Sequence, residues 1–589
     1  MAALGRASSS APVLAAAAAA AVLLSLCLAA LSEEQEQLEN LRFVRHAQDA
    51  PLVSSYNYIV IGGGTAGCPL AATLSEHSRV LLLERGGLPY ANMSSEQHFT
   101  DALADTSPAS PAQRFISEDG VVNARARVLG GGSCLNAGFY TRASNEYVRA
   151  AGLGRAAWLN SSYRWVERSL VFRPDVPPWQ AALRDALLEV GVTPDNGFTF
   201  DHVTGTKIGG TIFDNSGQRH TAADFLRHAR PRGLTVLLYA TVSRILFKSQ
   251  DGVPYPVAYG VVFSDPLGVQ HRVYLRDGDK NEVIVSAGTL GSPQLLMLSG
   301  VGPQAHLEAH GIEVIVDQPM VGQGVADNPM NSVFIPSPVP VELSLVQVVG
   351  ITRSGSFIEG VSGSEFGMPV SDGALRWARS FGMLSPQTGQ LGTLPPKQRT
   401  PEALQRAAEA MMRLDRRAFR GGFILEKILG PVSSGHVELR TTDPRANPSV
   451  TFNYFREAED LERCVHGIET IERVIQSRAF SNFTYANASV ESIFTDSANF
   501  PVNLLPRHVN DSRSPEQYCM DTVMTIWHYH GGCHVGAVVD DDYRVFGVHG
   551  LRVIDSSTFK YSPGTNPQAT VMMLGRYMGV KIQSERWKK

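Results

Sequence analysis

Short runs of consecutive apolar residues alternate with polar and glycine-rich stretches along the chain. Three of these runs, Tyr58–Ile61, Val80–Leu83 and 283–285, consist almost entirely of β-branched or aliphatic residues. Uninterrupted apolar runs of this length are typical of strands that are buried on both faces of a parallel sheet. Small-residue turns and helical segments come directly after the first and third runs. The pattern predicts an α/β fold with a Rossmann-like domain.

The turn after the first strand has the pattern Gly-x-Gly-x-x-Gly over residues 62–67. Gly62 permits the tight turn, Gly64 leaves room for a pyrophosphate beside the backbone, and Gly67 lets the next helix pack against the strand. The N-terminus of that helix directs its N–H groups at the phosphates. Glu84 ends the second strand, where its carboxylate can accept hydrogen bonds from a ribose diol. The sequence therefore predicts a site for an adenine dinucleotide.

Two other stretches have the composition of ligand-binding loops. Residues 126–136 contain three consecutive glycines together with Ser133 and Asn136, so the backbone can lie against a flat or phosphorylated ligand beside polar side chains. A flexible linker is the alternative interpretation, but Val, Leu and Cys are interleaved with these glycines. Residues 286–302 follow the third strand with a small-residue turn, a helix and a terminating glycine.

Length and charge limit the possible classes of protein. A chain of 589 residues exceeds a single compact core, so two domains, or one domain with large insertions, are expected. The formal net charge of −4 is small for this length and argues against a nucleic-acid partner.

The N-terminal segment 1–32 differs in composition from the rest of the chain. Residues 11–30 form a continuous, alanine-rich apolar run, and Arg6 is the only charged residue before Glu33. This pattern predicts a cleaved secretory signal peptide. An uncleaved membrane anchor is the alternative, because the run approaches the length of a membrane span. We expect a secreted protein that reaches the extracellular space or the cell wall through the endoplasmic reticulum.

In a secreted protein, Asn-x-Ser/Thr triplets can be glycosylated and cysteines can form disulfides. Five Asn-x-Ser/Thr triplets are expected at the surface; they begin at Asn92, Asn160, Asn482, Asn487 and Asn510. Outside the signal segment, Cys68, Cys134 and Cys533 lie in the first helix or in glycine-rich loops. Cys464 and Cys519 remain, and they are expected to form a disulfide, although spacing alone does not prove the pairing.

These motifs, taken together, resemble those of the glucose–methanol–choline (GMC) oxidoreductases. Residues 130–136 look like the first of that family's two motifs, and residues 288–302 fit the second. The similarity extends to three shorter stretches, at residues 219–226, 453–454 and 551–555. The resemblance implies that the dinucleotide is FAD rather than NAD, held non-covalently or through a histidyl link.

The resemblance also implies how the chain is divided. A Rossmann-like FAD-binding domain would be assembled from discontinuous segments at residues 50–155, 201–334 and 511–589, the last of which carries the active-site residues. A substrate-binding cap built on an antiparallel sheet would come from residues 156–200 and 335–510.

The resemblance also implies which residues in these motifs contact the cofactor. Val242 would meet the adenine through its backbone, and the backbone amide of Asp555 would lie near the phosphoribityl chain. Pro567 and Gln568 would lie by the pyrimidine end of the flavin. The expected cofactor-binding residues are Gly62, Gly64, Thr65, Ala66, Gly67, Glu84, Arg85, Val128, Gly131, Ser133, Asn136, Ala137, Val242, Ala287, Gly288, Trp527, His528, Asp555, Asn566, Pro567 and Gln568.

Three histidines and a cysteine fall within residues 525–534. Zinc binding is one interpretation, because His-x-His and Cys-His spacings can hold the metal; two consecutive glycines intervene, and we expect no metal. The other interpretation is general base catalysis, in which an imidazole takes the proton of a substrate alcohol while its hydride moves to flavin N5. The resemblance implies His528 as that base, and it gives His530 and His534 no chemical role.

The family's second active-site position, which is His or Asn, corresponds to Asn566. Its amide can donate a hydrogen bond to a developing alkoxide but cannot take a proton at neutral pH. Residues 527–533 resemble the plant branch of the family, which holds the mandelonitrile (hydroxynitrile) lyases and the HOTHEAD-like proteins. The lyases have histidine at the second position, whereas residues 564–570 look like the HOTHEAD-like branch, which is associated with oxidation of long-chain ω-hydroxy fatty acids.

We therefore expect an FAD-dependent alcohol oxidoreductase that acts on long-chain ω-hydroxy fatty acids or related alcohols. An (R)-mandelonitrile lyase that uses FAD without net redox chemistry is the alternative, and a non-catalytic flavin-binding protein is the second alternative. The expected partner is a small alcohol or cyanohydrin, with no nucleic acid and no stable membrane span after signal cleavage.

Overall fold

The computed structural model describes residues 41–89, 110–363, 421–498 and 514–587. The predicted signal peptide at residues 1–32 lies outside the described residues, as do the triplets at Asn92 and Asn510.

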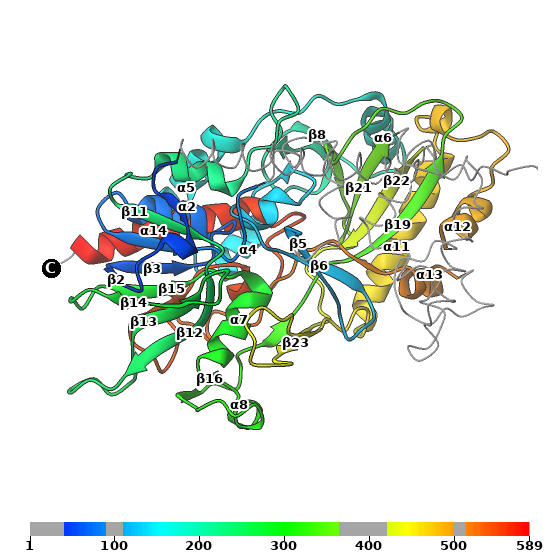
Figure 1. The fold of residues 1–589 in the computed structure, drawn as a ribbon. Helices are drawn as coiled ribbons and strands as arrows, with labels where there is room; N and C mark the ends of the chain where they lie inside the picture. Colours follow the sequence, from blue (N-terminus) through cyan, green and yellow to red (C-terminus); the bar gives the residue numbers. More distant parts are fainter. Residues whose placement is uncertain (1–40, 90–109, 364–420, 499–513, 588–589) are drawn as a thin grey trace, which may run out of the picture.

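A six-stranded sheet forms one end of the molecule (Figure 1), and all of its neighbouring strands are parallel. In spatial order its strands are β1 (Val44–His46), β11 (Leu234–Leu238), β4 (Val80–Leu83), β3 (Tyr58–Ile61), β15 (Glu282–Val285) and β26 (Leu551–Val553). The three apolar runs of the sequence are therefore adjacent central strands, and the predicted Rossmann-like α/β fold is confirmed.

Alternate residues of these strands pack into two separate cores, because successive side chains of a strand point to opposite faces. Val60 and Leu82 pack against the helices α2 (Gly67–Leu74), α5 (Ala156–Leu170) and α14 (Gln568–Trp587). Ile59 and Leu81 pack on the other side, against α7 (Gly288–Leu298) and an antiparallel meander. The meander and its added strand are β12 (Thr241–Lys248), β13 (Val257–Ser264), β14 (Gln270–Leu275) and β2 (Val53–Tyr56).

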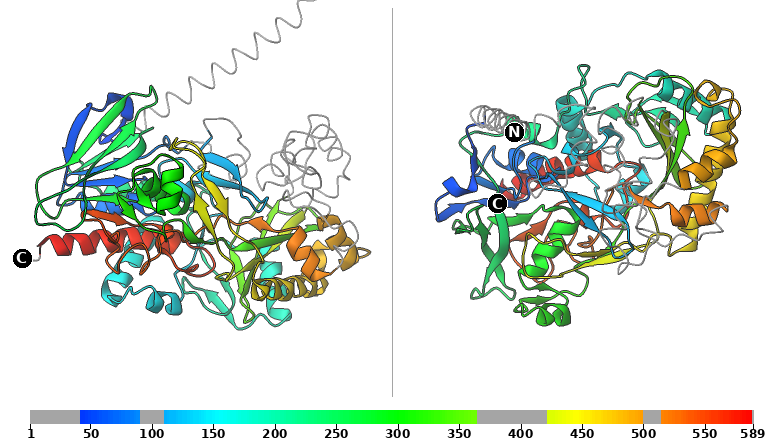
Figure 2. Two further views of the ribbon diagram at one scale, coloured as in Figure 1. Left: turned by 90° about the horizontal axis from the view of Figure 1, so that it is seen from below. Right: turned by 45° about the vertical axis from the view of Figure 1, so that its right-hand side comes forward.

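A seven-stranded sheet forms the other end of the molecule (Figure 2). Its order is β25 (Met524–Thr525), β19 (Pro329–Pro336), β22 (Gly421–Ile428), β21 (Ser356–Gly363), β20 (Val348–Ile351), β9 (Gly205–Ile208) and β8 (Asp195–Phe198). Every pairing is antiparallel except that of β8 with β9. Strand β9 and most of β19 come from residues 201–334, so the sheet extends beyond the two segments expected to form the cap.

One face of the seven-stranded sheet is covered by helices. Ile358, Ile424 and Val333 pack there against α6 (Pro178–Glu189) and α11 (Ala458–Gln476). The opposite face carries its own core, which includes Phe357 and Leu425 and reaches toward the parallel sheet. A hairpin of β5 (Ala112–Ile116) and β6 (Val122–Ala126) lies between the two sheets (Figure 1).

Short elements complete the described chain. They are η1 (Ala47–Asp49), η4 (Gly131–Cys134), β7 (Phe139–Tyr140), α4 (Asn145–Ala150), β10 (Gly210–Thr211), η5 (Ala222–His228), β16 (Val301–Gly302), α8 (Gln304–Ala309), β17 (Val316–Asp317), β18 (Gln323–Val325), β23 (Gly435–Glu438), β24 (Ser449–Thr451), η9 (Ser481–Phe483), α12 (Val490–Ala498), α13 (Pro515–Asp521) and η10 (Ser556–Thr558).

A disulfide joins Cys464 of α11 to Cys519 of α13, with Cα atoms 6.3 Å apart, so the predicted pairing is confirmed. Cys68, Cys134 and Cys533 are buried free thiols.

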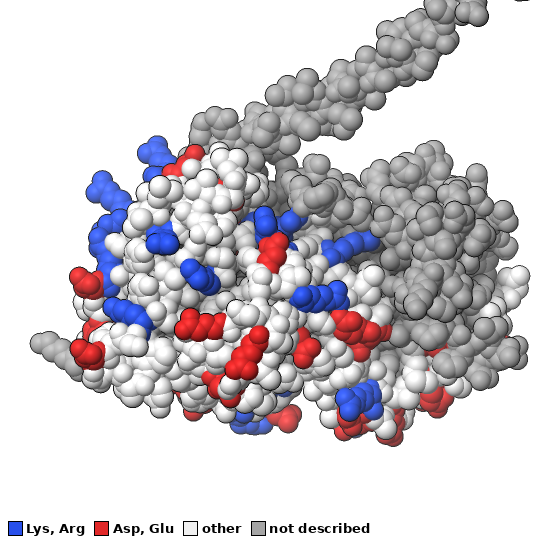
Figure 3. Space-filling view, turned by 60° about the horizontal axis from the view of Figure 1, so that its bottom comes forward, with Lys and Arg blue, Asp and Glu red and all other residues white. Residues whose placement is uncertain are grey.

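The surface of the described residues carries charges of both signs. Figure 3 shows Lys and Arg side chains scattered among Asp and Glu side chains on one face. The predicted glycosylation residues Asn160, Asn482 and Asn487 are exposed. Among the described helices, none combines the length and apolar character that a membrane span requires.

Candidate functional site

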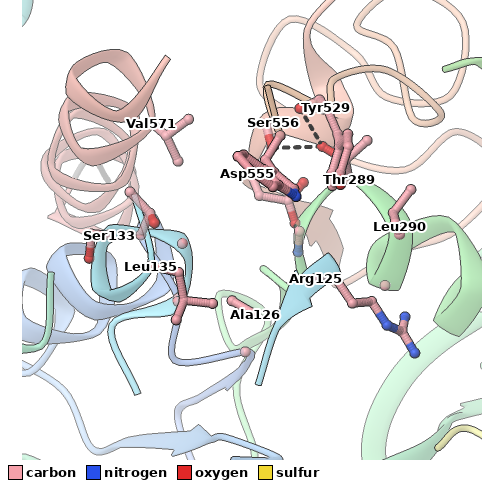
Figure 4. A pocket seen from close by; sticks show the side chains of 18 of the residues that line it. Arg125, Ala126, Ser133, Leu135, Thr289, Leu290, Tyr529, Asp555, Ser556 and Val571 are labelled. Carbon is pink, nitrogen blue, oxygen red and sulfur yellow. Dashed lines mark hydrogen bonds between the residues drawn. The ribbon is translucent and has the colours of Figure 1, made fainter. Parts of the chain in front are cut away.

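A cavity runs between the two sheets and brings the separated motifs together. The turn after β3, the η4 loop and the N-terminus of α7 line it, as do the loop after β25 and the N-terminus of α14. Figure 4 shows Ser133 and Leu135 from the η4 loop on one side, and Thr289, Asp555 and Tyr529 on the other. Five segments, drawn from the chain between residues 61 and 571, thus share one cavity.

All but one of the residues expected to bind the cofactor line this cavity. The lining residues are Gly62, Gly64, Thr65, Ala66, Glu84, Arg85, Val128, Gly131, Ser133, Asn136, Ala137, Val242, Ala287, Gly288, Trp527, His528, Asp555, Asn566, Pro567 and Gln568. Gly67 is buried and does not line the cavity. A Cβ at Gly67 would lie 1.9 Å from the carbonyl oxygen of Gly62, so this glycine allows the close packing of α2 on the turn.

The other two glycines of the turn have different surroundings. Gly62 has φ +103°, and a Cβ there would lie 2.2 Å from the carbonyl oxygen of Ser286 on the neighbouring strand connection. A Cβ at Gly64 would meet only the Cα of Gly131, at 3.8 Å. The protein itself therefore leaves space at Gly64, and this space belongs to the cavity, as expected where a ligand approaches the backbone.

The side chain of Glu84 is hydrogen-bonded to the backbone of the glycine turn that follows β3. Its carboxylate accepts the backbone N–H of Gly63 at 2.9 Å and that of Gly86 at 2.8 Å. Burial raises the pKa of Glu84, while these two N–H donors oppose the rise. Each carboxylate oxygen can accept a further hydrogen bond, so Glu84 retains acceptor capacity toward the cavity.

Asp555 contributes its side chain rather than only the backbone amide that the sequence suggested. Its carboxylate accepts hydrogen bonds from the N–H of Gly288 at 2.9 Å, the hydroxyl of Ser292 at 2.5 Å and the N–H of Ser557 at 2.8 Å. Asp555 thereby fixes the end of β26 to the N-terminus of α7. Beside it, Thr289 donates a hydrogen bond to the carbonyl oxygen of Tyr529 at 2.8 Å (Figure 4).

The loop after β25 carries His528 and is held by a buried carboxylate. Asp327, which is 2% exposed, accepts the backbone N–H of His528 at 2.8 Å. The same carboxylate accepts the hydroxyls of Thr525 at 2.6 Å and Tyr454 at 2.7 Å. Burial raises the pKa of Asp327 to about 7. Trp527 has φ +60°, a conformation that is uncommon for a bulky side chain and is maintained only where surrounding contacts impose it.

His528 and Asn566 present polar atoms that the described protein leaves unused. Nδ1 of His528 and Oδ1 of Asn566 are buried and have no hydrogen-bond partner among the described residues. Burial and the nearby Lys427 ammonium lower the pKa of His528 well below its usual value, so its imidazole is neutral at neutral pH. Buried polar atoms without a protein partner in a cavity wall are available to a ligand or a water molecule.

The neighbouring histidines have structural contacts. Nδ1 of His530 lies 3.0 Å from the carbonyl oxygen of His528, and burial lowers the pKa of His530 to about 4. Burial also lowers the pKa of His534, which contacts the turn at Gly324. Among the described residues, no three His, Cys, Asp or Glu side chains are arranged to hold a metal ion.

Sequence reasoning missed four charged residues of the site. Asp327 belongs to none of the motifs found in the sequence. It lies in the short loop between β18 and β19. Arg125, Glu359 and Lys427 line the cavity from β6, β21 and β22. In the sequence they look like single charges within strands, and only the pairing of those strands shows that they face the cavity.

Comparison with known proteins identifies the family. Two sequence models described as GMC oxidoreductase match residues 56–330 and 431–575. Protein HOTHEAD of Arabidopsis thaliana is 52% identical over 90% of this chain and 89% of its own length. The (R)-mandelonitrile lyase-like protein of the same plant is 48% identical over 93% of both chains.

The fold is also similar to that of a solved flavoprotein. A formate oxidase from Aspergillus oryzae, in a structure that concerns FAD modification, has a TM-score of 0.70 and 19% sequence identity. The match covers 91% of this chain and 99% of the oxidase. The glycine-lined cavity, with unpartnered polar atoms of His528 and Asn566 in its wall, has a lining that fits an elongated dinucleotide. The chain belongs to the GMC oxidoreductase family and is an FAD-dependent oxidoreductase.

Proposed function

We propose that the protein oxidises the hydroxyl group of a long-chain alcohol, such as an ω-hydroxy fatty acid, to the aldehyde. The observation that carries this proposal is the pair of unpartnered buried atoms, Nδ1 of His528 and Oδ1 of Asn566, in one cavity. FAD supplies the two-electron acceptor for this reaction. The residues expected to hold it are the glycines of the turn, Glu84 and the η4 loop at one end, and residues 566–568 at the other.

His528 is the base in this proposal. Its depressed pKa keeps the imidazole neutral, so it can accept the proton of the substrate hydroxyl at neutral pH. Asp327 holds the backbone of His528 in place at 2.8 Å and contacts no substrate in this proposal, so it is a positioning residue.

Asn566 completes the polar end of the cavity. It cannot take a proton at neutral pH, but its Nδ2 amide group can donate a hydrogen bond to the substrate oxygen as negative charge develops there, and its unpartnered Oδ1 can accept one from a ligand donor. One base and one neutral orienting group suit the oxidation of an alcohol. The apolar side chains of Val346, Val361 and Leu425 line the same cavity and suit an alkyl chain.

Anaerobic reduction tests the proposal. The FAD-loaded protein is mixed with ω-hydroxy fatty acids and 1-alkanols of graded length, and loss of the oxidised flavin absorption band is recorded. Bleaching that improves with chain length is expected. If mandelonitrile instead releases benzaldehyde and cyanide without bleaching, the protein is a lyase; if neither reaction occurs, it is a flavin-binding protein without turnover.

We also propose that the protein is secreted. The apolar N-terminal sequence, the disulfide and the exposed positions of Asn160, Asn482 and Asn487 support this. Expression of the full chain in plant cells, followed by endoglycosidase treatment of the cell-wall fraction, should give a mass decrease. Retention in the cytosol without glycans would contradict it.

A further inference from the structure

The cavity-facing side of the seven-stranded sheet contains a buried ion pair. Lys427 of β22 donates to one carboxylate oxygen of Glu359 of β21, and both side chains are at most 1% exposed. Strand register places Glu359 opposite Leu425 and Phe357 opposite Lys427, so the charged residues are diagonal neighbours on one face. Both line the cavity.

The pair has no evident role in stabilising the sheet. Phe357, Val361 and Leu425 around it belong to a buried apolar core. Removing two charges from water costs several kcal/mol per ion, and replacing a buried pair with apolar residues is often neutral or stabilising. An apolar pair at these positions would continue the surrounding core, so the charges call for a functional explanation.

One atom of the pair lacks a partner. Oε1 of Glu359 is buried and has no hydrogen-bond partner among the described residues. The nearby cation Lys207 does not fill this position, because its ammonium already donates to the Thr141 hydroxyl and to the carbonyl oxygens of residues 199 and 201. A carboxylate oxygen that is buried, unpartnered and part of a cavity wall is available to a ligand donor.

We propose that Glu359 and Lys427 form a subsite that binds a second hydroxyl group of the substrate alcohol. That hydroxyl donates to Oε1 of Glu359 and accepts from Nζ of Lys427. This inference rests on the proposed alcohol oxidation and narrows its substrate class to alcohols with a further hydroxyl close to the reacting carbon.

The charges of the pair select a neutral group. A carboxylate would be repelled by Glu359, and an ammonium by Lys427, whereas a hydroxyl is both donor and acceptor. The subsite lies near the reacting end, because Ile526 and Trp527, which directly precede His528, pack against the apolar core around Glu359 and Lys427, and all three charged or basic side chains line the same cavity. The second hydroxyl therefore belongs within a few bonds of the oxidised one, and the terminal carboxylate of a long fatty acid lies elsewhere.

The test compares octan-1-ol with octane-1,2-diol, octane-1,3-diol and octane-1,8-diol in anaerobic flavin reduction. At least one of the first two diols should exceed octan-1-ol in kcat/KM by about tenfold or more, since a site built to bond a hydroxyl rejects the analogue that lacks it. The double variant Glu359→Gln/Lys427→Met removes both charges together and should bring this ratio close to one. Equal kcat/KM values for all four alcohols in the unmodified enzyme would overturn the proposal.

Glu426→Gln is the matched control. It is the adjacent residue on β22, is buried, and lies beside Gly467 of α11 on the opposite face of the sheet. This variant should retain the diol preference. A double variant that also retains it would contradict the subsite.

A binding measurement distinguishes failure of the subsite proposal from failure of the proposed alcohol oxidation. If no alcohol bleaches the flavin, alcohol oxidation is wrong, and binding is measured by titrating each alcohol while recording the flavin absorption spectrum. A near diol should then have a Kd about tenfold lower than that of octan-1-ol, and only the double variant should lose this difference. Equal Kd values would overturn the subsite as well.

Discussion

The carboxylate of Asp327 accepts the backbone N–H of His528 at 2.8 Å, although 201 residues separate them in the sequence. The same carboxylate binds the hydroxyls of Thr525 and Tyr454, so it ties the loop after β25 to the start of β19. Trp527, with its positive φ, is held between two of these contacts. The position of the proposed base is therefore set by a residue that does not line the cavity.

Replacing Asp327 with alanine should misplace His528. We expect the rate of flavin reduction to fall by about 10²-fold, because a displacement of about 1 Å in a catalytic group can cost that much. FAD content should be unchanged. Asp327→Asn, which keeps an acceptor for the His528 N–H, should restore most of the rate; equal losses in both variants would argue against a positioning role.

Replacing His528 with alanine should remove the proton acceptor. The rate of flavin reduction by alcohol should fall by about 10²–10⁴-fold, the usual contribution of a general base. Absorption spectra should still show bound FAD. His530→Asn serves as the control, because it leaves the proposed base intact and should lose far less activity.

Gly64→Val should prevent FAD binding. A side chain at this position meets little protein but enters the cavity where the pyrophosphate is expected. The purified variant should be colourless, and Gly154→Val, at an exposed site, should remain yellow. A fully loaded Gly64→Val protein would contradict the placement of the dinucleotide.

The pH profile should reflect the depressed pKa of His528. Because the folded-state pKa of His528 lies well below 6.5, the base remains neutral at pH 6.5, and protonation of His528 should lower kcat/KM for octan-1-ol only below that pH. Removal of the Lys427 charge in Glu359→Gln/Lys427→Met raises the pKa of His528, so the decline should begin at higher pH. Glu426→Gln should leave the profile unchanged.

The disulfide should contribute to stability. It closes a loop of 55 residues, and replacing both Cys464 and Cys519 with serine should lower the free energy of unfolding by about 2–4 kcal/mol. Urea unfolding of the FAD-loaded protein measures this difference. Cys533→Ser, at a buried free thiol, gives the cost of the substitution itself.

Local sequence patterns predicted the parallel sheet well. Tyr58–Ile61 and Val80–Leu83 form strands with the bounds that the apolar runs indicated, because a strand buried on both faces must be apolar throughout. The glycine turn was equally readable from its local spacing: Gly67 is required by a contact with Gly62 in the same turn, although the contact that requires Gly62 comes from Ser286.

The cap and the charged wall of the cavity could not be predicted in this way. Glu359 and Lys427 become neighbours only through the register of β21 and β22, which lie on either side of a long intervening segment. Asp327 reaches His528 through tertiary structure alone. Both contacts, Glu359 with Lys427 and Asp327 with His528, depend on the pairing of strands that are distant in the sequence, and local periodicity does not specify that pairing.

The parallel sheet has a consequence for the order of synthesis. Its edge strand β26 is formed by residues 551–553, and the helix that covers the glycine turn, α14, begins at Gln568. While the ribosome still holds these residues, strand β15 keeps an open edge and α2 lacks its cover. A nascent chain therefore cannot complete the cofactor pocket until β26 and α14 have left the ribosome and packed against β15 and α2.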